Sequence, residues 1–166
     1  MSSLTDSHGT KRPRNADGGV RTQLAALAEQ VGAHLGHTPW ETMTQEQVGA
    51  FAELTCDHNF IHVDPRRAAE TPFGGTIAHG LFSLALLAPA TQRLQVTDAA
   101  TAVNYGVERV RFPAPLPVGA RWRASAEVIA VEEVKGGMQA RIRASAEVEG
   151  SERPAVVAEF LIRFYR

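Results

Sequence analysis

The chain has 166 residues, a formal net charge of −1 at pH 7 and a single cysteine. Its length favours one domain with its own core, and its near neutrality argues against non-specific binding of nucleic acid. The lone cysteine, Cys56, excludes an internal disulfide and agrees with a reducing, cytoplasmic compartment. No apolar run is long enough to cross a bilayer, so we expect no membrane span.

The first nineteen residues are almost wholly polar and charged. They lack the apolar stretch of a secretory signal, so residues 1–19 are predicted to form a disordered leader. The basic run Lys11–Arg14 could be a nuclear-type tag, but a solvated tail is the preferred interpretation. A single domain is then expected over residues 20–166.

Helical patterns come next along the chain. Apolar side chains recur with helical spacing over Val20–Leu35, which predicts a helix that Gly36 ends. Thr44 and Gln47 form a capping box, which predicts a second helix that runs to about Leu54.

Two further helices are predicted before the chain changes its pattern. Asp64 followed by Pro65 is typical of a cap and first turn, which predicts a short helix there. The segment LFSLALLAPATQRL at residues 81–94 starts with a run that is apolar on all sides, which indicates a buried helix. Pro89 is expected to kink this helix or to end its first half.

The rest of the chain alternates between apolar and polar residues, as strands with one wet face do. Gly136 and Gly137 predict a hairpin between the first two of these strands. The strands are expected at Arg121–Val134, Met138–Glu149 and Ala155–Tyr165, with a further one at Val103–Phe112. The predicted architecture is α+β, with one apolar helix packed against a curved antiparallel sheet.

The stretch TCDHNFIHVDP, residues 55–65, places an acid and imidazoles among apolar side chains. Asp57 and His62 would point to different faces of a continuous helix, so they converge only if the chain leaves the helix near Cys56. An acid and an imidazole that face one cavity can hold a water, one accepting a proton while the other supplies one.

A second chemical element is His79-Gly80, where the apolar helix should start. The first N–H groups of a helix lack internal partners, and in a dry site they can hold a developing negative oxygen. Gly80 would let a ligand approach the backbone closely.

Two other interpretations of these residues stay open. Asp57 could be a plain turn residue and His62 a core histidine bonded to a carbonyl. A zinc site is the other interpretation, with His58 and His62 at helical spacing and Asp57, Asp64 and His79 nearby. It requires the helix to continue through this stretch, so no metal is the preferred prediction.

The segment DHNFIHVDPRRAAETPFGGTIAHGLFSLALL resembles the MaoC-like family of R-specific enoyl-CoA hydratases. Its signature is an Asp, an Asn two residues on and a His three beyond, here Asp57, Asn59 and His62. A His-Gly that opens the central helix follows, here His79-Gly80. The later segment NYGVERVRFPAPLPVGARWRA is similar to the branch of this family that contains nodulation protein N.

This resemblance implies a hot-dog fold, in which a curved antiparallel sheet wraps a central apolar helix. It also implies a homodimer and reversible syn addition of water to a trans-2-enoyl thioester. Asp57 and His62 would be the catalytic pair. Asn59, His79 and Gly80 would serve substrate binding, with the Gly80 N–H donating to the thioester carbonyl. No separate cofactor is implied, because coenzyme A or a carrier pantetheine is part of the substrate.

The chain departs from the family pattern at three positions. Cys56 stands where a glycine is common, Phe60 where a proline is common, and Ala88 where some relatives have a serine. Neither Cys56 nor Phe60 removes a catalytic group, but both could reshape the pocket. Ser83 could substitute for the serine, but that role is not assigned to it. Candidates for contacts with the phosphates of coenzyme A are Arg66, Arg67, Arg109 and Arg111.

Two functional alternatives remain at this point. A hot-dog thioesterase would aim water at the thioester carbonyl, and a non-catalytic subunit would only bind acyl thioesters. The sequence leaves open the acyl length, the choice between coenzyme A and a carrier protein, the pathway, and which member of the pair handles each proton.

Overall fold

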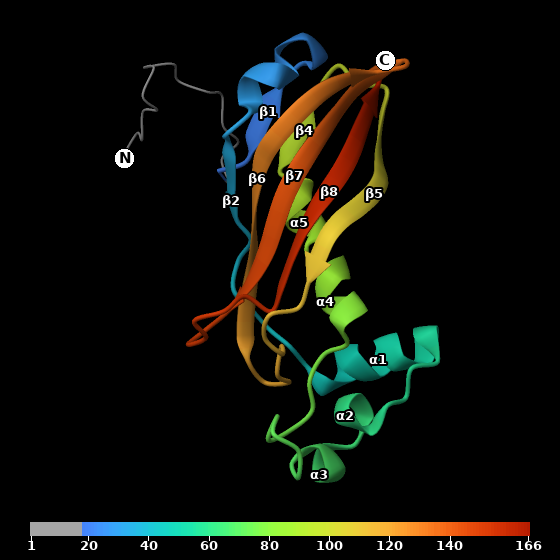
Figure 1. Cartoon of the computed structure of the whole chain (residues 1–166), viewed down its shortest axis with the longest axis vertical. Coiled ribbons are helices and arrows are strands. Elements are labelled where there is room, and N and C mark those ends of the chain that lie inside the picture. Colours follow the sequence, from blue (N-terminus) through green and yellow to red (C-terminus); the bar gives the residue numbers. More distant parts are fainter. Residues whose placement is uncertain (1–17) are drawn as a thin grey trace.

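The computed structural model describes residues 18–166. The basic run Lys11–Arg14 and all but the last two residues of the predicted leader lie outside this range. Within it, one curved sheet is the largest element of the fold, and the helices gather along one side and at one end of that sheet (Figure 1). No helix of this part is long and apolar enough to span a membrane.

The main sheet has six strands and is antiparallel throughout. Its order is β2-β6-β7-β8-β5, and β3 pairs with the start of β6, at Arg121 and Trp122. A separate pair of short strands, β1 and β4, is parallel. The bounds are β1 Val20–Thr22, β2 His34–His37, β3 Glu41–Thr42, β4 Leu94–Val96, β5 Thr101–Arg111, β6 Arg121–Val134, β7 Gly137–Val148 and β8 Val156–Tyr165.

Strands β6 and β7 confirm most of the alternation in the sequence, β8 confirms it in part, and β5 is mostly exposed. Trp122, Ala124, Ala126 and Val128 face the core, as predicted. The next residue of the predicted series, Ala130, is exposed. The pairing of β6 with β7 shifts between Val128 and Ala130, and an extra residue at such a bulge moves the following side chains to the other face.

The predicted glycine turn between β6 and β7 is confirmed, one residue earlier than expected. Val134 pairs with Gly137, so the turn consists of Lys135 and Gly136. Gly136 has φ +85, which glycine adopts without a steric cost. Gly137 already belongs to β7, where a Cβ would meet the carbonyl oxygen of Phe164.

The helix predicted over Val20–Leu35 is wrong. This segment forms strand β1, the 3-10 helix η1 (Leu24–Gln30) and strand β2. Val20, Leu27 and Leu35 are fully buried, as the pattern required, whereas Val31 is 42% exposed. A short helix between two buried strands gives the same spacing of apolar residues, and pairing with distant β4 and β6 decides between the two structures.

The two capped helices are confirmed. Helix α1 spans Gln45–Thr55, and Thr44 and Gln47 form the predicted capping box. Helix α3 spans Pro65–Ala68, and the Asp64 side chain accepts hydrogen bonds from the first N–H groups. Between them lies the single turn α2, Phe60–Val63.

The apolar helix along the sheet is shorter and less enclosed than predicted. It consists of α4 (Gly80–Ala85) and α5 (Ala88–Thr91), with Pro89 in the first turn of α5. Leu87 is fully buried against the sheet, whereas Leu81 is 66% exposed. The expectation of burial on all sides therefore fails for α4, because the sheet covers only one side of it in the single chain.

Candidate active site

The turn between α1 and α2 brings the acid of the opening motif towards the imidazole. Helix α1 ends at Thr55, and Cys56 then adopts a left-handed conformation with φ 57. Asn59 starts α2, with its side-chain oxygen accepting a hydrogen bond from Ile61 N at 3.3 Å. The predicted exit from the helix near Cys56 is thus confirmed, and it turns the chain back on itself.

Asp57, His62 and His79 meet at this turn. One carboxylate oxygen or ring nitrogen from each lies within 4.8 Å of those of the other two. Asp57 is exposed, whereas His62 and His79 are 7% and 3% exposed. The site therefore has an open acidic side and a closed side built of two imidazoles.

The ring of His62 is fixed by the backbone behind it. Its Nδ1 lies 2.7 Å from the carbonyl oxygen of Ile77. Because a carbonyl only accepts, Nδ1 carries the hydrogen, and Nε2 of the neutral ring keeps its lone pair. The ring thus presents an acceptor nitrogen to the site.

The backbone of this region is held by two side chains that the sequence did not single out. The amide of Gln45 donates to the His62 carbonyl at 2.7 Å and accepts from the Thr76 hydroxyl at 2.6 Å. The Ile77 N–H donates to the Ile61 carbonyl at 3.0 Å. Gln45 lies between the capping-box residues Thr44 and Gln47, and nothing in the sequence pointed to its contacts with His62 and Thr76.

The surroundings of His62 favour its uncharged form. Burial lowers the pKa of His62 below its ordinary value of 6.5, and the neighbouring His79 lowers it further. The Ile77 carbonyl and Asp57 act in the opposite direction but do not outweigh them. The imidazole can therefore accept a proton at neutral pH.

The remaining predicted residues lie around this pair. Gly80 is the first residue of α4, and a Cβ there would come 3.3 Å from the ring of Phe112. Asn59 is exposed, and its side chain is engaged in the cap of α2. Since α4 has only six residues, any donor at Gly80 would act through its own N–H rather than through a long helix dipole.

The geometry disfavours the zinc alternative in its predicted form. His58 does not join His62, because α1 ends at Thr55, before both residues, and the His58 ring lies 3.7 Å from the Glu53 carboxylate. The rings of His62 and His79 are stacked at 3.8 Å with 27° between their planes. Lone pairs in two such nearly parallel planes do not converge on one tetrahedral ion.

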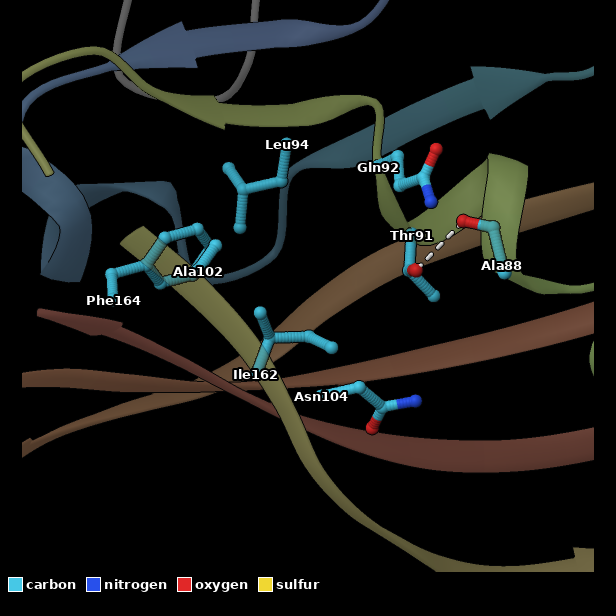
Figure 2. A pocket seen from close by; sticks show the side chains of 8 residues that line it. All are labelled: Ala88, Thr91, Gln92, Leu94, Ala102, Asn104, Ile162 and Phe164. Carbon is cyan, nitrogen blue, oxygen red and sulfur yellow. Dashed lines mark hydrogen bonds between the residues drawn. The ribbon is translucent and has the colours of Figure 1, made fainter. Parts of the chain in front are cut away.

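A cavity of about 270 Å³ lies further along the apolar helix. Figure 2 shows it between α5 on one side and strands β5 and β8 on the other. Ala88, where some relatives have a serine, lies on its wall, and the Thr91 hydroxyl there donates to the Ala88 carbonyl at 2.9 Å. The lining residues are Ala88, Thr91, Gln92, Leu94, Ala102, Asn104, Ile162 and Phe164.

The curved antiparallel sheet packed along an apolar helix places the chain among the hot-dog proteins. The (R)-hydratase from A. caviae involved in PHA biosynthesis superposes with a TM-score of 0.68 and 28% identity, over 81% of this chain and 96% of that chain. The unliganded R-hydratase of Pseudomonas aeruginosa gives a TM-score of 0.67 at 24% identity, over 82% of each chain.

Sequence comparison gives the family within this class. The family described as MaoC like domain matches residues 26–150, and the chain belongs to this family of dehydratases. It is 49% identical to 3-hydroxyacyl-thioester dehydratase Z of Mycobacterium tuberculosis over 144 residues, 85% of this chain and 95% of that protein. It is 37% identical to nodulation protein N of Rhizobium leguminosarum over 143 residues, 83% of this chain and 88% of that protein. The predicted fold and family are both confirmed.

Proposed function

We propose that the protein catalyses the reversible syn addition of water to a trans-2-enoyl thioester, which gives the (R)-3-hydroxyacyl thioester. The observation that carries this proposal is that the Asp57 carboxylate meets the ring of His62, whose Nδ1 is held by Ile77, in a chain of a dehydratase family. An acid and an imidazole this close together can bind one water molecule between them and transfer its protons.

In the hydration direction, Nε2 of His62 takes a proton from the water while the Asp57 carboxylate orients it. The water oxygen then bonds to the β-carbon, and the electron pair of the double bond moves toward the thioester carbonyl. The pair returns a proton to the α-carbon, which completes the addition. Because both groups would lie on the same side of the substrate, hydroxyl and proton reach one face of the double bond.

The transition state carries negative charge on the thioester oxygen, as in an enolate. We propose that the N–H of Gly80, the first residue of α4, donates to this oxygen, because the first N–H groups of a helix lack partners within it. Losing one such donor typically costs about 10²–10³ in rate.

The acyl chain is proposed to occupy the cavity between α5, β5 and β8. This cavity begins at Ala88, which follows Gly80 along the same apolar segment. Its walls are mostly apolar, which suits a hydrocarbon chain. A panel of trans-2-enoyl-CoA substrates of increasing length would show where turnover falls.

Coenzyme A or a carrier pantetheine is proposed as part of the substrate, with no separate cofactor, in a cytoplasmic homodimer. Four arginines are candidates for its phosphates. Arg66 and Arg67 lie on α3, where Arg67 covers the Phe60 ring at 4.2 Å. Arg109 and Arg111 lie at the bulged end of β5.

Turnover of crotonyl-CoA tests the proposal. We expect the enone absorbance to fall without release of free thiol, and Asp57→Asn and His62→Gln each to lower turnover by at least about 10²-fold with the fold intact. Thiol release would instead identify a thioesterase. Binding of the thioester without any turnover would identify a non-catalytic subunit.

A further inference from the structure

His79 lies where the three segments that build the site meet. It directly precedes Gly80 and α4, and its ring stacks on His62 with 3.8 Å between the centroids. On α1, the ring of Phe51 packs at 5.0 Å from it. The family resemblance assigns His79 to substrate binding, but these contacts are all with the protein itself.

The His79 ring also forms a hydrogen bond with the backbone of Asp57. Its Nε2 lies 3.0 Å from the Asp57 backbone oxygen, and because this oxygen only accepts, Nε2 carries the hydrogen. The bond links residues 22 positions apart. By contrast, the Asp57 carboxylate accepts from Asn59 N at 3.3 Å, a local bond that moves with the turn. His79 thus ties the exposed turn to a buried part of the site.

We propose that His79 is a positioning residue for the acid–base pair, tying the Asp57 backbone to the start of α4 while its ring supports that of His62. This inference rests on the function proposed above. Misplacing a catalytic group by about 1 Å can cost about 10²-fold in rate. A single hydrogen bond that fixes the position of the turn can therefore have a large effect on turnover.

His79 also acts on His62 electrostatically. In residues 18–166, Asp57 and His79 are the titratable groups that act on the pKa of His62, in opposite directions. The His79 ring lowers that pKa, which keeps the acceptor nitrogen available as the pH falls. A residue that only filled space would not have this effect.

Two variants separate the hydrogen bond from the stack. His79→Phe keeps a ring against His62 but has no N–H to donate to Asp57. His79→Gln keeps an N–H near the position of Nε2 but has no ring. We expect His79→Phe to lower kcat by about 10–10²-fold with KM changed less than about threefold, and His79→Gln to retain more of kcat.

The pH profile supplies a readout that a purely structural role would leave unchanged. In both variants the acidic midpoint of kcat/KM should move to higher pH, because neither carries the imidazole whose electrostatic effect lowers the pKa of His62. Ser83→Ala is the matched control. The Ser83 hydroxyl donates to the His79 carbonyl at 3.2 Å without touching Asp57 or His62, so kcat and the midpoint should stay near the wild-type values.

Hydrogen exchange of the peptide that contains residues 56–59 tests the tie without any substrate. It should quicken in His79→Phe relative to wild type and to Ser83→Ala. A wild-type kcat in His79→Phe, or unchanged exchange in this peptide, would overturn the positioning role. If the wild type turns over no enoyl thioester, the proposed function fails, and the exchange measurement still decides whether His79 holds the turn.

Discussion

At the scale of single residues, His62 has one nitrogen committed to the protein and one left for chemistry. The Ile77 carbonyl takes the hydrogen on Nδ1 at 2.7 Å, so the ring is oriented and its tautomer is set. Burial and the neighbouring His79 lower its pKa. These features together favour a neutral imidazole that can accept a proton, as the proposed role of His62 requires.

The activity is therefore expected to persist into mildly acidic solution. A histidine that works as a base is lost when it is protonated, so a pKa below the ordinary 6.5 moves the loss of activity to lower pH. We predict an acidic midpoint of kcat/KM below 6.5 for crotonyl-CoA, measured from about pH 4.5 to about pH 8. A midpoint above 6.5 would contradict the assignment of His62 as the base.

The pair at the centre of the site could be predicted from the sequence, but the groups that hold it could not. Asp57 and His62 are near in sequence, and the turn formers between them indicated that the helix ends there. The contacts of Gln45 with His62 and of His79 with Asp57 span 17 and 22 positions. Such contacts depend on how helices pack, which no local pattern specifies.

At the scale of elements, the end of α1 sets the direction in which Asp57 points. Cys56 closes this helix with φ 57, a conformation that costs a residue with a Cβ about 1 kcal/mol or more. Glycine, common at this position in the family, adopts it freely. The turn at Cys56 therefore carries strain in this chain.

Replacing Cys56 by glycine should relieve that strain. We predict that Cys56→Gly raises the free energy of unfolding by about 0.5–1 kcal/mol, as measured by chemical denaturation. The neighbouring Thr55→Gly is the control with the opposite sign, because it places glycine inside the last turn of α1 and should destabilise by about 1 kcal/mol. A loss of stability in Cys56→Gly would show that the thiol makes contacts worth more than the strain.

The strands followed from the sequence more closely than the N-terminal part of the domain did. Alternation over β6 to β8 distinguishes the solvent-exposed face from the buried face of any strand that packs on a core. The segment from Val20 to Leu35 has the apolar residues of a helix, but its ends pair with β4 and β6, far away in the chain. The bulge after Val128 likewise depends on the partner strand.

At the scale of the whole molecule, β5 is an edge strand of the main sheet. One side of β5 pairs with β8, and the other side pairs with no strand of the described residues. It has eleven residues, and most of them are exposed, among them Val103 at 44% and Tyr105 at 56%. A long exposed edge with apolar side chains is a template for pairing with another strand. In the proposed homodimer, β5 of a second copy would cover this edge.

A charge on this edge should therefore weaken the dimer. Two copies of Val103→Lys would bring like charges to the strand pair, and we expect its dissociation constant to rise by at least about tenfold, measured by sedimentation across protein concentrations. Val31→Lys is the control. Val31 is 42% exposed, but it belongs to the segment between η1 and β2, and β2 lies at the edge of the sheet opposite β5 (Figure 1). If Val103→Lys associates as the wild type does, or if the wild type is a monomer at every concentration, β5 is not the dimer edge. Loss of turnover together with the dimer would further show that the catalytic site depends on the second copy.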